Sequence, residues 1–277
     1  MDNNILYIIL VLICVMIYIK LMQESSEKFS STQKNAICFI TRYLEPELLN
    51  FANKCAVYND VYIIVDDNKQ EIKSTNPKVL IVQIDENICK DKKYINSTWR
   101  FKIEVSGWDK AFYYFCENNN VYDNVWFIED DVFIGKPNTL SMIDKKYGKV
   151  DLLINKMNNI SRNKSDNEDW NQRIKIAKNF YKNKEIYWSW VCAMRCSKEL
   201  LNNIKKFRNE NNQLFFHEIM IPTMISNSDL TYKKIQELSN IIYRKTYKDS
   251  EIVSNPMNLY HPIKDYNRHV LLHNLIK

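Results

Sequence analysis

The sequence predicts an α/β domain in which helices flank a mainly parallel β-sheet, preceded by an N-terminal transmembrane helix. Short, continuous apolar runs alternate with helical patterns, and two of these runs end in acidic clusters. Continuous apolar runs are typical of parallel strands that are buried on both faces. An uncharged apolar run near the N-terminus predicts the membrane helix.

The composition is that of a folded protein and excludes several functions. The chain has 277 residues, 45% of them hydrophobic and 26% charged, with a formal net charge of +6. These values exclude a disordered chain. The three glycines, at positions 107, 135 and 148, lie too far apart for a P-loop or a GxGxxG turn. The sequence has no basic stripe or stacking motif, so we expect no nucleic-acid partner.

Residues 5–22 are predicted to be a transmembrane anchor. The run ILYIILVLICVMIYI contains no charge and no proline before Lys20 interrupts it. As a helix the segment would span roughly 22–27 Å, slightly less than a hydrocarbon core of about 30 Å. A signal peptide and a buried core helix are the alternatives. The segment lacks the positive n-region of a signal peptide, and it lacks the polar face expected of a helix in a globular core. A polar stem, residues 23–35, and a domain, residues 36–277, are expected to follow.

Membrane orientation has two interpretations. Lys20 and Lys28 follow the apolar run, and positive-inside counting therefore favours a cytosolic domain. Sequons at Asn96, Asn159 and Asn163 favour a lumenal domain of the Golgi or ER kind. We expect a single-pass membrane protein with a lumenal domain, and the cytosolic face remains the alternative. Several cysteines lie in apolar runs, which favours reduced core thiols.

The first half of the domain is predicted to alternate strands and helices. Residues 36–41 (AICFIT), 61–65 (VYIIV) and 79–84 (VLIVQI) are short apolar runs, as in buried strands. Residues 46–55 begin with a proline and continue with apolar residues at helical spacing. Residues 99–118 form a longer helical pattern that ends in a run of asparagines.

The second half continues the alternation. Strands are predicted over residues 125–128 (VWFI), 151–154 and 187–195 (YWSWVCAMR), and helices over 198–207 and 215–225. The polar segment 155–184 is predicted to hold a surface helix or a loop. Because the sequence shows no internal repeat and no second linker, we expect one domain after the stem.

The strongest chemical signal is the acidic cluster Glu129, Asp130 and Asp131, which directly follows a buried apolar strand. Adjacent carboxylates repel one another and lose hydration unless a cation neutralises them. In an extended backbone Glu129 and Asp131 share a face and Asp130 points the opposite way. This pattern predicts a site for Mn²⁺ or Mg²⁺ with positions left for diphosphate oxygens. A solvated turn is the alternative.

The segment IEDDV after a hydrophobic strand resembles the D-x-D-type motif, in its EDD form, of GT-A glycosyltransferases. The order of the elements is similar from Ala36 to His273. The resemblance implies a GT-A-like domain, a nucleotide-diphosphate sugar donor and a Mn²⁺ or Mg²⁺ cofactor. It implies Asp131 as a metal ligand, with Glu129 and Asp130 contacting the nucleotide sugar.

Other positions extend the resemblance on the donor side. The segment VYIIVDD is similar to the second GT-A strand, which implies that Asp66 or Asp67 holds the base or ribose. Thr41 and Arg42 end the first strand, where the family often has a nucleotide contact. Lys110 lies in the helix before the EDD motif, where such enzymes carry a basic donor-site contact; a solvated helix face is the alternative.

Two late segments complete the expected site. An acid within the apolar run FFHEIMIPTM is unfavourable unless it faces a cleft. The resemblance implies Glu218 as the catalytic base, with His217 orienting it or contacting the acceptor. A capping or helix-surface pair is the alternative. In the segment YHPIK, the resemblance implies His261 as a second metal ligand and Lys264 as a cation beside the leaving diphosphate.

Two further pairs have predominantly structural interpretations. His269 and His273 have the i, i+4 spacing of metal ligands, but without a third partner they favour a surface helix. Trp188 and Trp190 alternate along a predicted strand and are expected in the core more than on a sugar-stacking platform.

The sequence thus predicts a membrane-anchored, metal-dependent glycosyltransferase of the hexosyl or N-acetylhexosaminyl type. It would transfer a sugar, with inversion, to a glycan, protein or lipid acceptor; retention stays open. A nucleotidyltransferase is one alternative, although the Gly-rich loop usual in that class is missing from AICFITRYLEP. A membrane-anchored, non-catalytic interaction domain of the same fold is the other.

Overall fold

The computed structural model describes residues 33–96, 104–118, 121–161 and 167–276. Nearly all of these belong to a compact unit, Asn35–Lys277, distinct from Met1–Lys34. The predicted anchor, residues 5–22, lies outside the described residues. Among the residues that are described, no helix combines the length and apolar character needed to cross a membrane.

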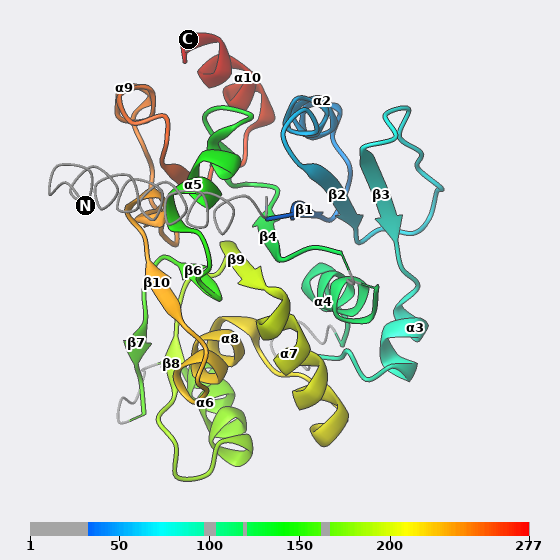
Figure 1. Ribbon diagram of the computed structural model, residues 1–277, viewed down its shortest axis with the longest axis vertical. Coiled ribbons are helices and arrows are strands. Elements are labelled where there is room, and N and C mark those ends of the chain that lie inside the picture. Colours follow the sequence, from blue (N-terminus) through cyan, green and yellow to red (C-terminus); the bar gives the residue numbers. More distant parts are fainter. Residues whose placement is uncertain (1–32, 97–103, 119–120, 162–166, 277) are drawn as a thin grey trace, which may run out of the picture. The chain divides into compact units, whose positions relative to one another are not determined.

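A seven-stranded sheet forms the centre of the unit, in the order β10-β6-β9-β4-β1-β2-β3 (Figure 1). Its strands are β1 (Asn35–Thr41), β2 (Asp60–Val65), β3 (Val79–Gln83), β4 (Asn124–Glu129), β6 (Leu152–Ile154), β9 (Ala193–Ser197) and β10 (Tyr232–Lys234). All neighbouring pairs are parallel except those of β9, which runs antiparallel to β4 and β6. The α/β class and the mainly parallel sheet are therefore confirmed, and the reversal of β9 makes the sheet mixed.

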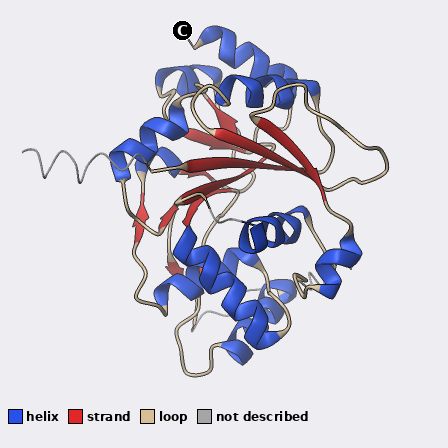
Figure 2. Cartoon of the chain, turned by 45° about the vertical axis from the view of Figure 1, so that its right-hand side comes forward, coloured by secondary structure: helices blue, strands red, loops and turns tan. Residues whose placement is uncertain are grey.

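Helices cover both faces of this sheet (Figure 2). One apolar cluster lies under α4 (Gly107–Asn118), α6 (Glu168–Phe180), α7 (Lys198–Asn211) and α8 (His217–Ser226). The opposite cluster lies under α2 (Pro46–Cys55) and α5 (Thr139–Tyr147). The central strands are buried on both faces, as their continuous apolar runs require.

Smaller elements complete the unit. They are α3 (Glu86–Asp91), η2 (Gln236–Leu238), α9 (Asp249–Ser254), α10 (Tyr266–Leu275) and two minor sheets. One minor sheet joins β11 (Asn240–Ile241), β12 (Leu259–His261) and β5 (Phe133–Ile134). The other pairs β7 (Asn158–Asn159) with β8 (Tyr187–Trp188). Apart from α10, where a surface helix was expected at His269 and His273, these short elements were not predicted, because they lack a long periodic pattern.

The strand order determines where a ligand can bind. The chain passes from β1 to β2 and β3 on one side and returns to β4 on the other, so β1 and β4 flank a topological switch point. In open α/β sheets, ligands bind beyond the carboxyl ends of the strands at such a point. The reversed β9 begins at the edge where β4 ends, because the two strands are antiparallel.

Two predicted elements differ from the structure. The helix predicted over residues 99–118 begins at Gly107, and the described residues 104–106 before it are not helical. Ser106 and Asp109 form a capping box there, in which the Asp109 carboxylate accepts from the Ser106 backbone N–H at 2.7 Å. The strand predicted over 187–195 is divided into β8 and β9, because the Ser189 N–H pairs with the Glu218 carbonyl of α8 instead.

Candidate functional site

The acidic cluster lies at the carboxyl end of β4, beside the switch point. The indole Nε1 of Trp108 donates to Oε1 of Glu129 at 2.7 Å. Asp130 points elsewhere, with its Oδ2 2.5 Å from the hydroxyl of Thr41 at the end of β1. Glu129 and Asp131 both approach His261, whose Nε2 lies 3.8 Å from Oε2 of Glu129 and 3.3 Å from Oδ1 of Asp131. The alternating directions of the three carboxylates are therefore as the extended pattern predicts.

The small sheet explains why His261 reaches the cluster from so far along the chain. Phe133, two residues after Asp131, pairs with Tyr260 in the antiparallel β5–β12 ladder. The N–H of Ile263 also donates to the carbonyl of Asp131 at 2.8 Å. His261 is only 6% exposed. Burial favours the neutral imidazole, but the carboxylates of Asp131 and Glu129 outweigh it and raise the His261 pKa above its ordinary value.

Cys192 is a site residue that the sequence analysis missed. The N–H of Glu129 donates to the carbonyl of Cys192 at 2.8 Å, which continues the antiparallel ladder beyond the Ile128–Ala193 pair. Residues directly opposite in antiparallel strands place their side chains on the same face. Glu129, Cys192 and His261 each offer one ligand atom within 4.8 Å of the others. The reversed direction of β9, which the apolar run did not reveal, creates this neighbourhood.

These residues fit a divalent cation. The buried Oδ1 of Asp131 has only the His261 imidazole near it, at 3.3 Å, among the contacts of the described residues. Burial, and then the charge of Asp131, raise the pKa of Glu129 above its ordinary value. A bound cation would compensate for the lost hydration of these carboxylates and would neutralise the repulsion between them. Carboxylate oxygen and imidazole nitrogen are ordinary ligands of such ions.

The donor-side candidates Asp66 and Lys110 lie together beside the switch point. The ammonium of Lys110 lies 2.7 Å from Oδ1 of Asp66 and donates to the Asp66 carbonyl at 2.6 Å. Lys110 is fully buried, so the alternative of a solvated helix face is wrong. A Cβ added at Gly107 would lie 2.9 Å from Cγ2 of Ile40, which shows how closely the start of α4 approaches β1.

The remaining donor-side candidates lie at the ends of β1 and β2. Thr41 is buried, whereas Arg42 is exposed and its guanidinium lies 5.2 Å from the ring centre of Tyr43. Asp67 is half-buried, and its carbonyl accepts from Nε2 of Gln83 at 2.8 Å. All of these residues therefore lie at the edge that the sequence predicted, but Arg42 has no contact with the acidic cluster among the interactions of the described residues.

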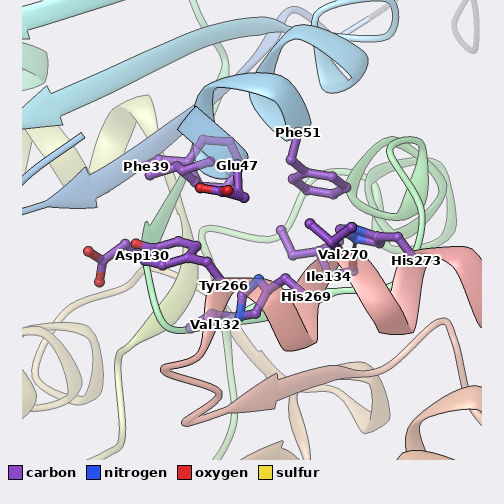
Figure 3. Close-up of a pocket in the computed structure, with 11 residues that line it drawn as sticks. Phe39, Glu47, Phe51, Asp130, Val132, Ile134, Tyr266, His269, Val270 and His273 are labelled. Carbon is purple, nitrogen blue, oxygen red and sulfur yellow. Dashed lines mark hydrogen bonds between the residues drawn. The ribbon is translucent and has the colours of Figure 1, made fainter. Parts of the chain in front are cut away.

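Asp130 borders a separate pocket, shown in Figure 3. The hydroxyls of Thr41 and Tyr266 both hydrogen-bond its carboxylate, and burial raises its pKa despite them. The pocket is lined by Phe39, Glu47, Leu48, Phe51, Asp130, Val132, Ile134, Tyr266, His269, Val270 and His273. Glu129, Asp131 and His261 are not among these residues, so Asp130 faces away from the ion site.

Glu218 lies in the first turn of α8, near the acidic cluster. Burial, with the charge of Glu129, raises its pKa to about 8, while Arg173 and Lys156 oppose this rise. The ring of His217 stacks on Trp108, with ring centres 4.6 Å apart and an angle of 20°. Burial, and then Arg173, lower the His217 pKa to about 3, so this imidazole is neutral near pH 7. One indole therefore contacts both His217 and Glu129.

The late basic candidates differ in their surroundings. Lys264 is 81% exposed at its side chain, and its ammonium lies 3.9 Å from Oδ2 of Asp131. His269 and His273 lie on α10, as expected of a surface helix, and their rings pack on Phe133. Their Nε2 atoms hydrogen-bond backbone carbonyls, at 2.7 and 2.9 Å. These two nitrogens are therefore engaged in packing α10.

Trp188 and Trp190 are half-buried rather than core residues. Their rings meet edge to face, 4.7 Å between centres, and the Lys156 ammonium lies 4.1 and 5.1 Å from the two rings. Trp190 also stacks on Tyr243 at 5.4 Å. Burial lowers the pKa of Lys156, and the charge of Glu218 opposes this shift, so Lys156 and the two indoles lie on the Glu218 side of the site.

Comparison with known proteins gives similar folds at low identity. No family model and no curated protein matches the chain. The galactosyltransferase LgtC, solved with donor and acceptor sugar analogs, aligns over 87% of this chain and 95% of its own, with 10% identity and a TM-score of 0.48. Mouse xyloside xylosyltransferase 1 in its apo form aligns over 83% and 97%, with 10% identity and a TM-score of 0.40. At these values the alignments assign neither a family nor an activity to this chain.

Proposed function

We propose that this protein is a metal-dependent glycosyltransferase that transfers a sugar from a nucleotide diphosphate to an acceptor hydroxyl. The observation that carries the proposal is the convergence of Glu129, Asp131 and His261 at the switch point of the sheet. The pair of buried Lys110 and half-buried Asp66 lies at the same edge, where a nucleoside would bind. The GT-A class, the sugar donor and inversion at the anomeric carbon are all parts of this proposal.

A divalent ion is the cofactor that this proposal requires. Asp131 and His261 would hold it, with Glu129 beside them, and Mn²⁺ or Mg²⁺ is the ion implied by the EDD motif. When bound, such an ion neutralises the charge that develops on a leaving diphosphate. Lys264 is exposed and within 3.9 Å of Asp131, so it can add a second positive charge at the same place.

Glu218 is proposed as the general base. The acceptor hydroxyl attacks the anomeric carbon, the bond from that carbon to the diphosphate oxygen breaks, and the hydroxyl proton passes to the Glu218 carboxylate. A carboxyl whose pKa is about 8 is a stronger base than an ordinary glutamate and still ionises near neutral pH. His217, stacked on Trp108 and neutral, positions the first turn of α8.

Donor hydrolysis tests the proposal directly. The full-length chain, purified in detergent, is incubated with a panel of nucleotide-diphosphate sugars, with Mn²⁺ or with a chelator, and the released nucleoside diphosphate is measured. We expect ion-dependent release from one donor, reduced about 100-fold or more in Asp131→Asn. Asp91→Asn, an exposed acid at the end of α3, should keep the full rate.

Two outcomes would overturn the proposal. Release of pyrophosphate from a nucleoside triphosphate and a sugar phosphate would identify a nucleotidyltransferase. No release, with no thermal stabilisation by ion and nucleoside diphosphate together, would indicate a non-catalytic interaction domain.

A further inference from the structure

We propose that Cys192 is a third ligand of the ion site, and that the site therefore prefers a thiophilic divalent ion such as Zn²⁺ to Mg²⁺. The inference deepens the proposed function, because it concerns the ion of the same site. The inference rests on the proposed function for what the ion does in the reaction. The ion binding itself can be measured without any sugar donor.

The position of Cys192 follows from the sheet. The Glu129 N–H to Cys192 carbonyl bond sets these residues opposite each other, so their side chains lie on the same face. The Cys192 thiol also hydrogen-bonds the Glu129 carboxylate. Any ion that binds Glu129 is therefore next to this sulfur.

The imidazole completes a three-ligand set of different donor types. His261 is more than nine-tenths buried, and its Nε2 faces the carboxylates of Glu129 and Asp131. Ligand atoms that share a tetrahedral ion at ordinary bond lengths lie about 3.5 Å apart. The spacings of 3.8 Å from His261 to Glu129 and 3.3 Å to Asp131 are already close to this value. Small side-chain movements would bring one oxygen, one sulfur and one nitrogen onto a common ion, because all three lie within 4.8 Å of one another.

The chemistry of this set selects the ion. Mg²⁺ demands oxygen ligands in near-octahedral geometry and retains water, whereas thiolate and imidazole suit Zn²⁺ and Co²⁺. Glu129, His261 and Cys192 would supply one carboxylate, one imidazole and one thiolate, with Asp131 as a further carboxylate beside His261, and zinc sites are built from ligands of these types. The other five cysteines among the described residues are free and buried, and none of them belongs to this cluster.

Cobalt spectroscopy tests the sulfur ligand without any activity measurement. The full-length chain is stripped with a chelator and titrated with Co²⁺, and the near-ultraviolet thiolate-to-cobalt charge-transfer band is recorded. We expect the band in the wild type and in the control Cys55→Ser, a buried cysteine at the end of α2, and its loss in Cys192→Ser. Competition titrations should show a loss of at least about tenfold in Zn²⁺ affinity for Cys192→Ser, with weak Mg²⁺ binding unchanged.

X-ray absorption of the zinc-loaded wild type keeps the test decisive if Cys192→Ser fails to fold. A sulfur shell at about 2.3 Å beside nitrogen and oxygen at about 2.0–2.1 Å supports the proposal. A shell of nitrogen and oxygen alone, or a folded Cys192→Ser that binds Zn²⁺ as tightly as the wild type, overturns it. If the sulfur ligand is found but no donor is hydrolysed, the ion site is supported and the proposed function is wrong. If a donor is hydrolysed with Mn²⁺ but no sulfur ligand is found, the proposed function is supported and Cys192 is not a ligand.

Discussion

Glu218 combines an apolar environment with a charged neighbour, and its protonation should control the reaction rate. Because a base must be ionised, we expect kcat/KM to rise about tenfold per pH unit below pH 8 and to level off above it. Glu218→Gln should reduce transfer about 10²–10⁴-fold above pH 8, and the difference should shrink at lower pH, where the wild-type carboxyl is protonated. A rate that is independent of pH between 6 and 8, or a Gln variant of normal activity, would exclude this residue as the base.

The same residue should lower stability as the pH rises. Its folded pKa, about 8, lies above the ordinary value of 4.5, so between these values the folded state holds a proton that the unfolded state has released. The contribution to the free energy of unfolding therefore falls from pH 4.5 to pH 8. In the ion-free protein, urea unfolding should show Glu218→Gln gaining stability relative to the wild type over this range.

Arg195 illustrates a buried charge with a structural role. It is fully buried on β9, where its guanidinium pairs with Asp144 at 3.0 Å and donates to the carbonyls of Gly148 and Val150. The indole of Trp126 donates to the same Asp144 oxygen. We expect Arg195→Met to lower the free energy of unfolding by about 3–5 kcal/mol, because Asp144 would remain buried without a counter-ion.

A second substitution separates this charge effect from lost packing. In the double variant with Asp144→Leu, most of the lost stability should return, because no charge is then left unpaired. Urea denaturation of the single and double variants measures both values. Equal stability of the two variants would contradict an electrostatic cause.

At the scale of the elements, the β5–β12 pairing determines where His261 lies. A Cβ at Gly135, directly after β5, would lie 2.4 Å from the carbonyl oxygen of Pro256, which precedes β12. Gly135→Ala should therefore displace β12, lower stability by about 1–3 kcal/mol and weaken ion affinity. Calorimetric titration with Mn²⁺ and Zn²⁺ measures the affinity.

Gly148 provides the matched control. It ends α5 with φ at +52°, so alanine there also introduces backbone strain of about 1–3 kcal/mol, but no atom lies within 4 Å of the added Cβ. Gly148→Ala should lower stability and leave ion affinity unchanged. Equal losses of affinity in both variants would show that general destabilisation, and not the position of β12, is responsible.

The sequence predicted the regular elements better than the junctions between them. The apolar runs of β1, β2 and β4 indicate buried strands, and the acids after β4 indicate its end, because both signals are local. The direction of β9 depends on pairing with distant strands, and no local pattern encodes it. Cys192 was missed for this reason. The burial of Lys110 could not be predicted from its helix alone, because its partner, Asp66, follows the separate strand β2.

At the scale of the whole chain, the sequons give a test of membrane orientation. Asn96 is only 3% exposed, whereas Asn159 on β7 is exposed. If the domain is lumenal, the folded protein should carry a glycan at Asn159 and none at Asn96, because a glycan at a buried side chain cannot be accommodated. Asn163, the third sequon, lies outside the described residues.

Translation into microsomes followed by glycosidase digestion measures this outcome. A mobility shift that Asn159→Gln reduces and Asn96→Gln leaves unchanged would support the lumenal domain. A chain without any glycan would favour the cytosolic orientation, and a folded chain with a glycan at Asn96 would contradict the burial of that residue.

The reversal of β9 also affects how such a protein can evolve. The nucleotide side of the proposed site comes from β1, β2 and α4, whereas the opposite side comes from β8, the residues before β9, and α8. The two sets meet around Glu129, through its backbone hydrogen bond to Cys192 and through the Trp108 indole, which contacts both Glu129 and His217. Substitutions in the second set can therefore accumulate while the Asp66–Lys110 pair is retained. Under the proposed function, a lineage with this architecture can exchange its acceptor and keep its donor.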